Sequence, residues 1–281
     1  MKIAVFGTSG QLGHVLERVL STRHEVTPYP RDFDVRNREG VFEAVRAARP
    51  DVVVNAAAMT NVERCERDDE AFSMNALGAR WVAQASAAGG ALLVQMSTDY
   101  VFRGDKGAPY HEWDDVGPIQ DYGRSRLAGE EEAREHAPRH LIVRTAWLYG
   151  GKTAGYVQSV LEKARRKETV WAVDDLIGSP TLIDDLAAAV LQLIEAEAMG
   201  TVHVANPGSA SRYGFAQEVL RCAGATASVR AVASGTLASV VPRPHDCSLT
   251  SLVLPAFGVS MRPWTEALRA YVRQESMSQP Q

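Results

Sequence analysis

The sequence predicts an α/β protein whose parallel strands are joined by crossover helices. Short β-branched runs alternate with longer stretches that carry apolar residues at three- and four-residue spacing. A glycine turn follows the first apolar run directly, at residues 7–13. After about residue 150 the alternation loosens and prolines interrupt shorter elements, which indicates a smaller second lobe.

The expected elements alternate regularly in chain order. Strand segments are rich in Val, Ile and Leu, as in strands buried on both faces, and they are 2–6, 25–29, 51–55, 91–97, 140–145 and 169–172. Helical segments have one apolar face, and they are 11–21, 38–48, 68–88, 122–136, 156–166 and 183–196.

Composition excludes several classes of protein. With 281 residues and 46% hydrophobic side chains, the chain can build a full core. Its 30 basic and 34 acidic residues leave no basic field for nucleic acid. Cys65, Cys222 and Cys247 are scattered, so we expect neither disulfides nor a metal site. No signal-peptide pattern or long apolar run is present, so we expect a soluble, cytoplasmic protein that does not contact membranes.

The turn at residues 7–13 has the features of a dinucleotide-binding turn. Glycines at every third position allow a tight turn, let backbone N–H groups approach a pyrophosphate, and let the following helix pack closely on the strand. An ordinary strand-to-helix turn could also contain three glycines, but the position inside an N-terminal βαβ unit favours cofactor binding. The expected contacts are Gly7, Ser9, Gly10, Gln11, Leu12 and Gly13.

The Gly-x-x-Gly-x-x-Gly spacing resembles the extended branch of the short-chain dehydrogenase/reductase superfamily, which implies a Rossmann-type doubly wound sheet. After the second strand, Arg31 suits the 2′-phosphate of NADP, whereas an NAD site usually has an acid there, so we expect NADP rather than NAD. The resemblance places Asp34 and Val35 beside the adenine. Small side chains after the third strand would let the cofactor approach the backbone, and they are Ala56, Ala57 and Ala58.

Two longer segments make the resemblance specific. Residues 97–102, Ser-Thr-Asp-Tyr-Val-Phe, and residues 122–130, Tyr-Gly-Arg-Ser-Arg-Leu-Ala-Gly-Glu, are similar to motifs of the dTDP-4-dehydrorhamnose reductases and their relatives. The resemblance covers about residues 1–272. Further matching segments are 55–62, 109–112, 144–150 and 178–181.

The resemblance implies that NADPH reduces a 4-keto group on a nucleotide-linked 6-deoxysugar, with Tyr122 as proton donor. Thr98 could hydrogen-bond the ketone oxygen as negative charge develops on it. The family has a lysine one helical turn after the tyrosine, and Arg126 stands there in this sequence. Tyr122 and Arg126 would also contact the cofactor. The substrate contacts that the resemblance implies are Asp99, Tyr100, Val101, Phe102 and Trp147.

The sequence departs from the family at the catalytic and substrate positions. Arginine keeps the positive charge that lowers a phenol pKa, but its planar fork is larger than an ammonium and differently aimed. Alternatively, Arg126 is a surface arginine paired with Glu130 one turn later. Leu176 replaces a family glutamine, and Arg212 and Gly214 replace a tryptophan and a glutamate.

Two functions from different classes are consistent with these features. The first is an NADPH-dependent reductase of a nucleotide-linked keto-sugar. The second is a non-catalytic protein that binds NADP or a sugar nucleotide and acts as a regulatory or partner subunit; an epimerase or dehydratase matches less well. Residues 1–150 are expected to form the NADP-binding portion and residues 151–281 mainly a substrate-binding lobe, with some elements returning to the sheet. A homodimer would agree with the resemblance.

Overall fold

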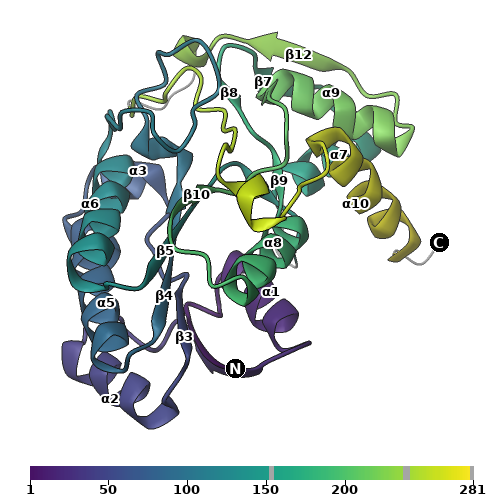
Figure 1. Ribbon diagram of the computed structural model, residues 1–281. Helices are drawn as coiled ribbons and strands as arrows, with labels where there is room; N and C mark the ends of the chain where they lie inside the picture. The colour runs from purple at the N-terminus through teal and green to yellow at the C-terminus, as the bar shows by residue number, and fades with distance from the viewer. Residues whose placement is uncertain (152–154, 237–240, 279–281) are drawn as a thin grey trace.

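A computed structural model describes residues 1–151, 155–236 and 241–278. Its centre is a six-stranded sheet in the order β10-β5-β4-β3-β1-β2, and every neighbouring pair is parallel (Figure 1). The α/β prediction with a Rossmann-type parallel sheet is therefore confirmed. The strands are β1 (Lys2–Phe6), β2 (Glu25–Tyr29), β3 (Val52–Asn55), β4 (Leu92–Thr98), β5 (His140–Thr145) and β10 (Gly200–His203).

Helices cover both faces of this sheet (Figure 1). On one face, α1 (Gln11–Leu20) and α8 (Ile183–Glu195) pack their apolar residues against the strands. The other face is covered by α2 (Arg38–Ala48), α5 (Gly78–Ala88) and α6 (Asp121–His136). Each fully buried Val or Leu contributes about 1.5–3 kcal/mol, so these two layers stabilise the platform on which the site lies.

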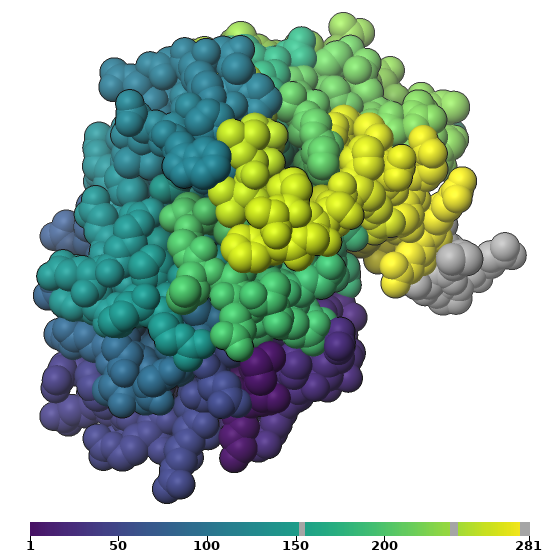
Figure 2. Space-filling view, in the orientation of Figure 1, coloured from purple at the N-terminus to yellow at the C-terminus, as the bar shows by residue number. Residues whose placement is uncertain are grey.

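A third apolar cluster forms what we call the C-terminal lobe, built from α7 (Tyr156–Arg165), α9 (Arg212–Ala223) and α10 (Trp264–Ser278) around β7 (Val170–Val173), which pairs with β12 (Val229–Val232). Figure 2 shows the C-terminal segment, coloured yellow, lying against the green surface of this lobe and the teal surface of the N-terminal half. The remaining short elements are α3 (Val62–Cys65), α4 (Glu70–Phe72), β6 (Leu148–Tyr149), β8 (Ile177–Gly178), β9 (Thr181–Leu182) and β11 (Ala210–Ser211).

The glycine turn lies where the order of strands reverses. From β1 the chain adds β2 on one side and β3 on the other, so the carboxyl end of β1 opens into a crevice between two diverging connections. Ligands of open α/β sheets bind at such points.

Several elements differ from the sequence prediction, which among others did not include α9, α10 and β12. The strand expected at 169–172 is observed as β7, but it pairs with β12 outside the central sheet. The edge strand β10 was not predicted, and it is a strand through its pairing with β5. The helix expected at 68–88 is interrupted by a π-helical turn at Ser73–Leu77. In the described parts of the chain, no helix has the length and apolar character needed to cross a membrane.

Candidate active site

A cleft of about 470 Å³ lies at the carboxyl ends of the central strands. One end is formed by the glycine turn and by Ala56 and Ala58 after β3. The other end is formed by residues that follow β4 and β5, together with the start of α6. We call these the cofactor end and the substrate end.

Backbone groups approach one another closely at the cofactor end. Gly7 has φ +87°, and a Cβ atom there would lie 2.7 Å from the Ala57 nitrogen. A Cβ atom on Gly13 would lie 2.1 Å from the Gly7 oxygen. The Gly10 nitrogen donates to the Gly7 oxygen at 3.0 Å and precedes the first turn of α1. This turn therefore fits a pyrophosphate held at the α1 N-terminus, where a side chain would obstruct it.

Other predicted cofactor residues surround the turn. Gln11 and Leu12 line the cleft, and the Gln11 amide donates to the Gly150 oxygen. The Ser9 hydroxyl accepts from the Arg31 backbone nitrogen at 2.9 Å, which places the exposed Arg31 side chain beside the turn.

Asp34 and Val35 do not present their side chains to the cleft. The Asp34 carboxylate is paired with the Arg36 guanidinium at 2.7 Å, and this contact lowers its pKa. Val35 is 1% exposed, and its side chain packs against Gly78 at the start of α5.

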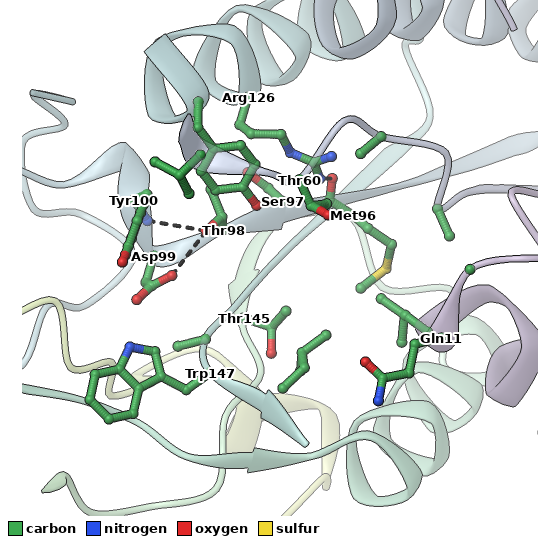
Figure 3. Close-up of a pocket in the computed structure, with 18 of the residues that line it drawn as sticks. Gln11, Thr60, Met96, Ser97, Thr98, Asp99, Tyr100, Arg126, Thr145 and Trp147 are labelled. Atoms are coloured by element: carbon green, nitrogen blue, oxygen red, sulfur yellow. Dashed lines mark hydrogen bonds between the residues drawn. The ribbon is translucent and has the colours of Figure 1, made fainter. Parts of the chain in front are cut away.

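The three predicted catalytic side chains lie together at the substrate end. Thr98 is the last residue of β4, Tyr122 is in the first turn of α6, and Arg126 follows one turn later; all three line the cleft. A Cβ atom on Gly123 would lie 2.1 Å from the Tyr100 oxygen, so the start of α6 packs directly against the turn after β4. Figure 3 shows Thr98 beside Tyr100, with Arg126 extending from its helix toward Met96.

Burial raises the pKa of Tyr122, while the positive charge of Arg126 and a hydrogen bond with Thr98 act in the opposite direction. Burial has the largest effect, so the phenol is protonated at neutral pH. A protonated phenol can donate to an oxygen that gains negative charge.

Arg126 is a cleft residue and not a surface residue. It is 6% exposed, and its Nη2 atom donates to the Met96 oxygen. The alternative of an ion pair with Glu130 is wrong because Glu130 is fully buried and its carboxylate is bound by Arg144, at 2.9 and 2.7 Å. That pair joins α6 to β5 and thereby fixes the helix that carries Tyr122.

A second positioning group was not found from the sequence. Asn75, in the π-helical turn, accepts from the Met59 nitrogen at 2.8 Å and donates to the Ser125 hydroxyl at 2.9 Å. Ser125 in turn donates to the backbone carbonyl oxygen of Tyr122. The available signal was a polar residue within a segment of helical period, and π turns commonly occur at functional sites.

The turn after β4 divides its side chains between the cleft and the core. Asp99 and Tyr100 line the cleft, and Thr98 donates to Asp99 Oδ1 at 2.9 Å. Burial raises the Asp99 pKa to about 7, and its Oδ2 atom has no hydrogen-bond partner. The substrate contacts predicted for Val101 and Phe102 are corrected, since both are fully buried in an apolar cluster behind the cleft.

Trp147 forms the opposite wall of the substrate end (Figure 3). It has φ +42°, and the Arg212 guanidinium lies 3.6 Å from its ring centroid. A Cβ atom on Gly178 would lie 2.3 Å from the indole ring, so the ring is enclosed between Gly178 and Arg212. Arg212, which the sequence identified as a departure without a role, therefore lines the cleft.

Comparisons with known proteins agree with this arrangement. The family model described as the RmlD substrate binding domain matches residues 1–277. The chain belongs to this family. It is 36% identical to the spore coat polysaccharide biosynthesis protein SpsK of Bacillus subtilis (strain 168), covering 98% of each chain. It is 34% identical to the dTDP-4-dehydrorhamnose reductase of Escherichia coli (strain K12), covering 93% of this chain and 96% of that protein.

Solved structures of the family superpose closely on the chain. The dTDP-4-dehydrorhamnose reductase from Bacillus anthracis str. Ames, in complex with NADP, matches with a TM-score of 0.94 and 34% identity, covering 97% of this chain and 99% of the other. The resemblance inferred from the motifs is thus confirmed, as is the prediction of an enzyme of the sugar-nucleotide reductase type.

Proposed function

We propose that the protein reduces the 4-keto group of a dTDP-linked 6-deoxysugar with hydride from NADPH. The observation that supports this most is the meeting of Thr98, Tyr122 and Arg126 in a cleft whose other end is a glycine turn. SpsK and the dTDP-4-dehydrorhamnose reductases are about equally similar to the chain, so the comparisons do not choose between their substrates. The identity of the sugar is therefore part of the proposal.

The cofactor end fits NADPH, which when bound supplies hydride to the substrate carbon. The close backbone approaches at Gly7 and Gly13 leave room for a pyrophosphate at the start of α1. Arg31, beside the turn, offers a cation to the 2′-phosphate. Ala56 and Ala58 line the cleft with side chains small enough to admit a ribose.

At the substrate end, Tyr122 donates the proton that the ketone oxygen gains on reduction. The phenol is protonated at neutral pH, as donation to the ketone oxygen requires. The Thr98 hydroxyl hydrogen-bonds the same oxygen and orients the carbonyl. Trp147 presents an aromatic wall to the sugar.

Arg126 performs the electrostatic part of the lysine's role. Its charge lowers the Tyr122 pKa against the effect of burial, which eases proton transfer. One N–H group donates to the Met96 oxygen, and the other N–H groups can bind the nicotinamide ribose from a side chain that lines the cleft. Arginine does not release a proton at neutral pH, so the phenol must regain its proton from solvent or from a hydroxyl.

The decisive experiment measures NADPH oxidation with a dTDP-linked 4-keto-6-deoxysugar, comparing the natural protein with Arg126→Lys. Turnover by the natural protein is expected. If the natural protein binds NADPH but only Arg126→Lys turns over, the chain is a reductase scaffold that now serves in binding. If neither protein turns over while both bind NADPH, the proposed reaction is wrong for this sugar.

A further inference from the structure

A second compartment of about 190 Å³ adjoins the substrate end of the cleft. Tyr100, Trp147 and Arg212 line both spaces, and Leu176 and Arg243 line the second alone. The two spaces therefore meet at the stacked pair of Trp147 and Arg212. Two arginines and no carboxylate line the second compartment.

Arg212 is a cation without an anionic partner. Its guanidinium lies over the Trp147 ring at 3.6 Å and over the Tyr156 ring at 5.0 Å. Among the described residues, no carboxylate forms an ion pair with it, and burial lowers its pKa. The acid that faces it is Asp99, whose own pKa burial raises to about 7. A partly desolvated guanidinium of this kind is costly unless an anion binds to it.

The other arginine of the compartment is already neutralised. The Arg243 guanidinium forms an ion pair with Glu63 through Nη2. Arg212 therefore carries a charge that a ligand anion can neutralise, whereas the charge of Arg243 is already paired. The Arg212 guanidinium lies over two aromatic rings, and a guanidinium in contact with aromatic faces can still donate from its N–H groups to phosphate oxygens.

We propose that Arg212 binds the diphosphate of the sugar nucleotide. This inference rests on the proposed function, which places the reacting carbon beside Tyr122 and Thr98. In a six-membered sugar ring the C4 carbon lies across the ring from C1, which carries the diphosphate. With C4 at Tyr122, the diphosphate points away from the cofactor end, toward Trp147 and Arg212, and the nucleoside enters the second compartment.

The test measures binding of dTDP, dTMP and thymidine by calorimetry, in the presence of saturating NADP⁺ so that the cofactor end is occupied. The variants are Arg212→Gln and Arg212→Lys. The matched control is Arg221→Gln on the same helix, where an exposed guanidinium is paired with Glu218. NADPH affinity and thermal unfolding of each variant verify that the cofactor end and the fold are intact.

Arg212→Gln should weaken dTDP binding about 10- to 100-fold, as expected for the loss of charge-assisted hydrogen bonds. The loss should be smaller for dTMP and absent for thymidine, Arg212→Lys should retain part of the affinity, and Arg221→Gln should bind like the natural protein. The proposal is overturned if Arg212→Gln binds dTDP normally, if thymidine is weakened equally, or if the natural protein does not bind dTDP.

These outcomes separate this inference from the proposed function. If the natural protein reduces the keto-sugar and Arg212→Gln binds dTDP normally, the proposed reductase activity stands and the proposed role of Arg212 is wrong. If the natural protein binds dTDP through Arg212 but does not oxidise NADPH, the role of Arg212 stands and the proposed reductase activity is wrong.

Discussion

The two ends of the cleft are formed by different parts of the chain, backbone atoms at one end and side chains at the other. At the cofactor end the fit depends on backbone atoms, since a Cβ atom on Gly7 or Gly13 would lie within 2.7 Å of another residue's backbone. At the substrate end it depends on side chains, and Arg126 and Arg212 stand there in place of other residue types. A site made of backbone contacts admits few substitutions, whereas a site made of side chains can change its ligand without disturbing the fold.

The largest effect should come from the proton donor. Tyr122→Phe should lower kcat by about 100- to 10,000-fold, the range of a lost general acid. NADPH affinity should stay within a few-fold, since the glycine turn is untouched and only one hydroxyl is lost. Steady-state kinetics and fluorescence titration check both parts. Normal turnover by the phenylalanine variant would show that Tyr122 is not the proton donor.

The buried ion pair of Glu130 and Arg144, which holds α6 against β5, should tolerate substitution far less than the side chains that line the substrate end. Glu130→Gln leaves the buried Arg144 guanidinium without its carboxylate and should lower the free energy of unfolding by about 3–5 kcal/mol. Denaturant unfolding measures this change. Glu197→Gln, with a 78% exposed side chain, is the control and should change little.

The same pair predicts a pH dependence of stability. Contact with Arg144 lowers the Glu130 pKa in the folded protein, so its stabilisation is complete above the ordinary glutamate value of about 4.3 and is lost as the pH falls below it. The natural protein should lose stability in this acidic range more steeply than Glu130→Gln. Parallel curves for the two proteins would contradict the assignment.

A single methyl group should damage the cofactor end. Gly13→Ala places a Cβ atom 2.1 Å from the Gly7 oxygen, so the turn must open, and we expect NADPH affinity to fall about 100-fold. The control is Gly235→Ala, because a Cβ atom there meets nothing within 4 Å. If Gly13→Ala binds NADPH as tightly as the natural protein, the contrast between the two ends fails.

The smallest effect should be a pH dependence confined to the substrate end. Asp99 has a pKa of about 7, so it gains a negative charge near neutral pH beside the diphosphate. Affinity for a dTDP-sugar, whose diphosphate does not titrate there, should fall a few-fold between about pH 6 and pH 8. Asp99→Asn should remove this dependence and leave NADPH binding unchanged. Equal slopes in both proteins would exclude Asp99 as the titrating group.

The sequence predicted those features that depend on residues close together in the chain. The glycine turn and the spacing of Tyr122 and Arg126 follow from one strand-to-helix junction and one helical turn, so the sequence was enough to place them. Val101 and Phe102 could not be separated from Asp99 and Tyr100, because the tight turn after β4 decides which side chains face the cleft.

Features that depend on distant pairing were not predictable. The strand character of β10 comes from its partner β5, some 55 residues earlier in the chain, rather than from its own four residues. The stacking of Arg212 on Trp147 likewise joins a helix of the C-terminal lobe to a loop after β5. The hydrophobic periodicity of these segments does not indicate which distant residues they contact.

The late return of the chain to the central sheet affects how the protein can be made and divided. Both α8 and β10 follow the first elements of the C-terminal lobe in sequence, yet they complete the sheet and cover one of its faces. A nascent chain ending near residue 150 would present an unpaired β5 edge and a bare apolar surface, both of which promote aggregation. We therefore expect that residues 1–150 alone do not fold as an autonomous module, because β10 (Gly200–His203) completes the sheet.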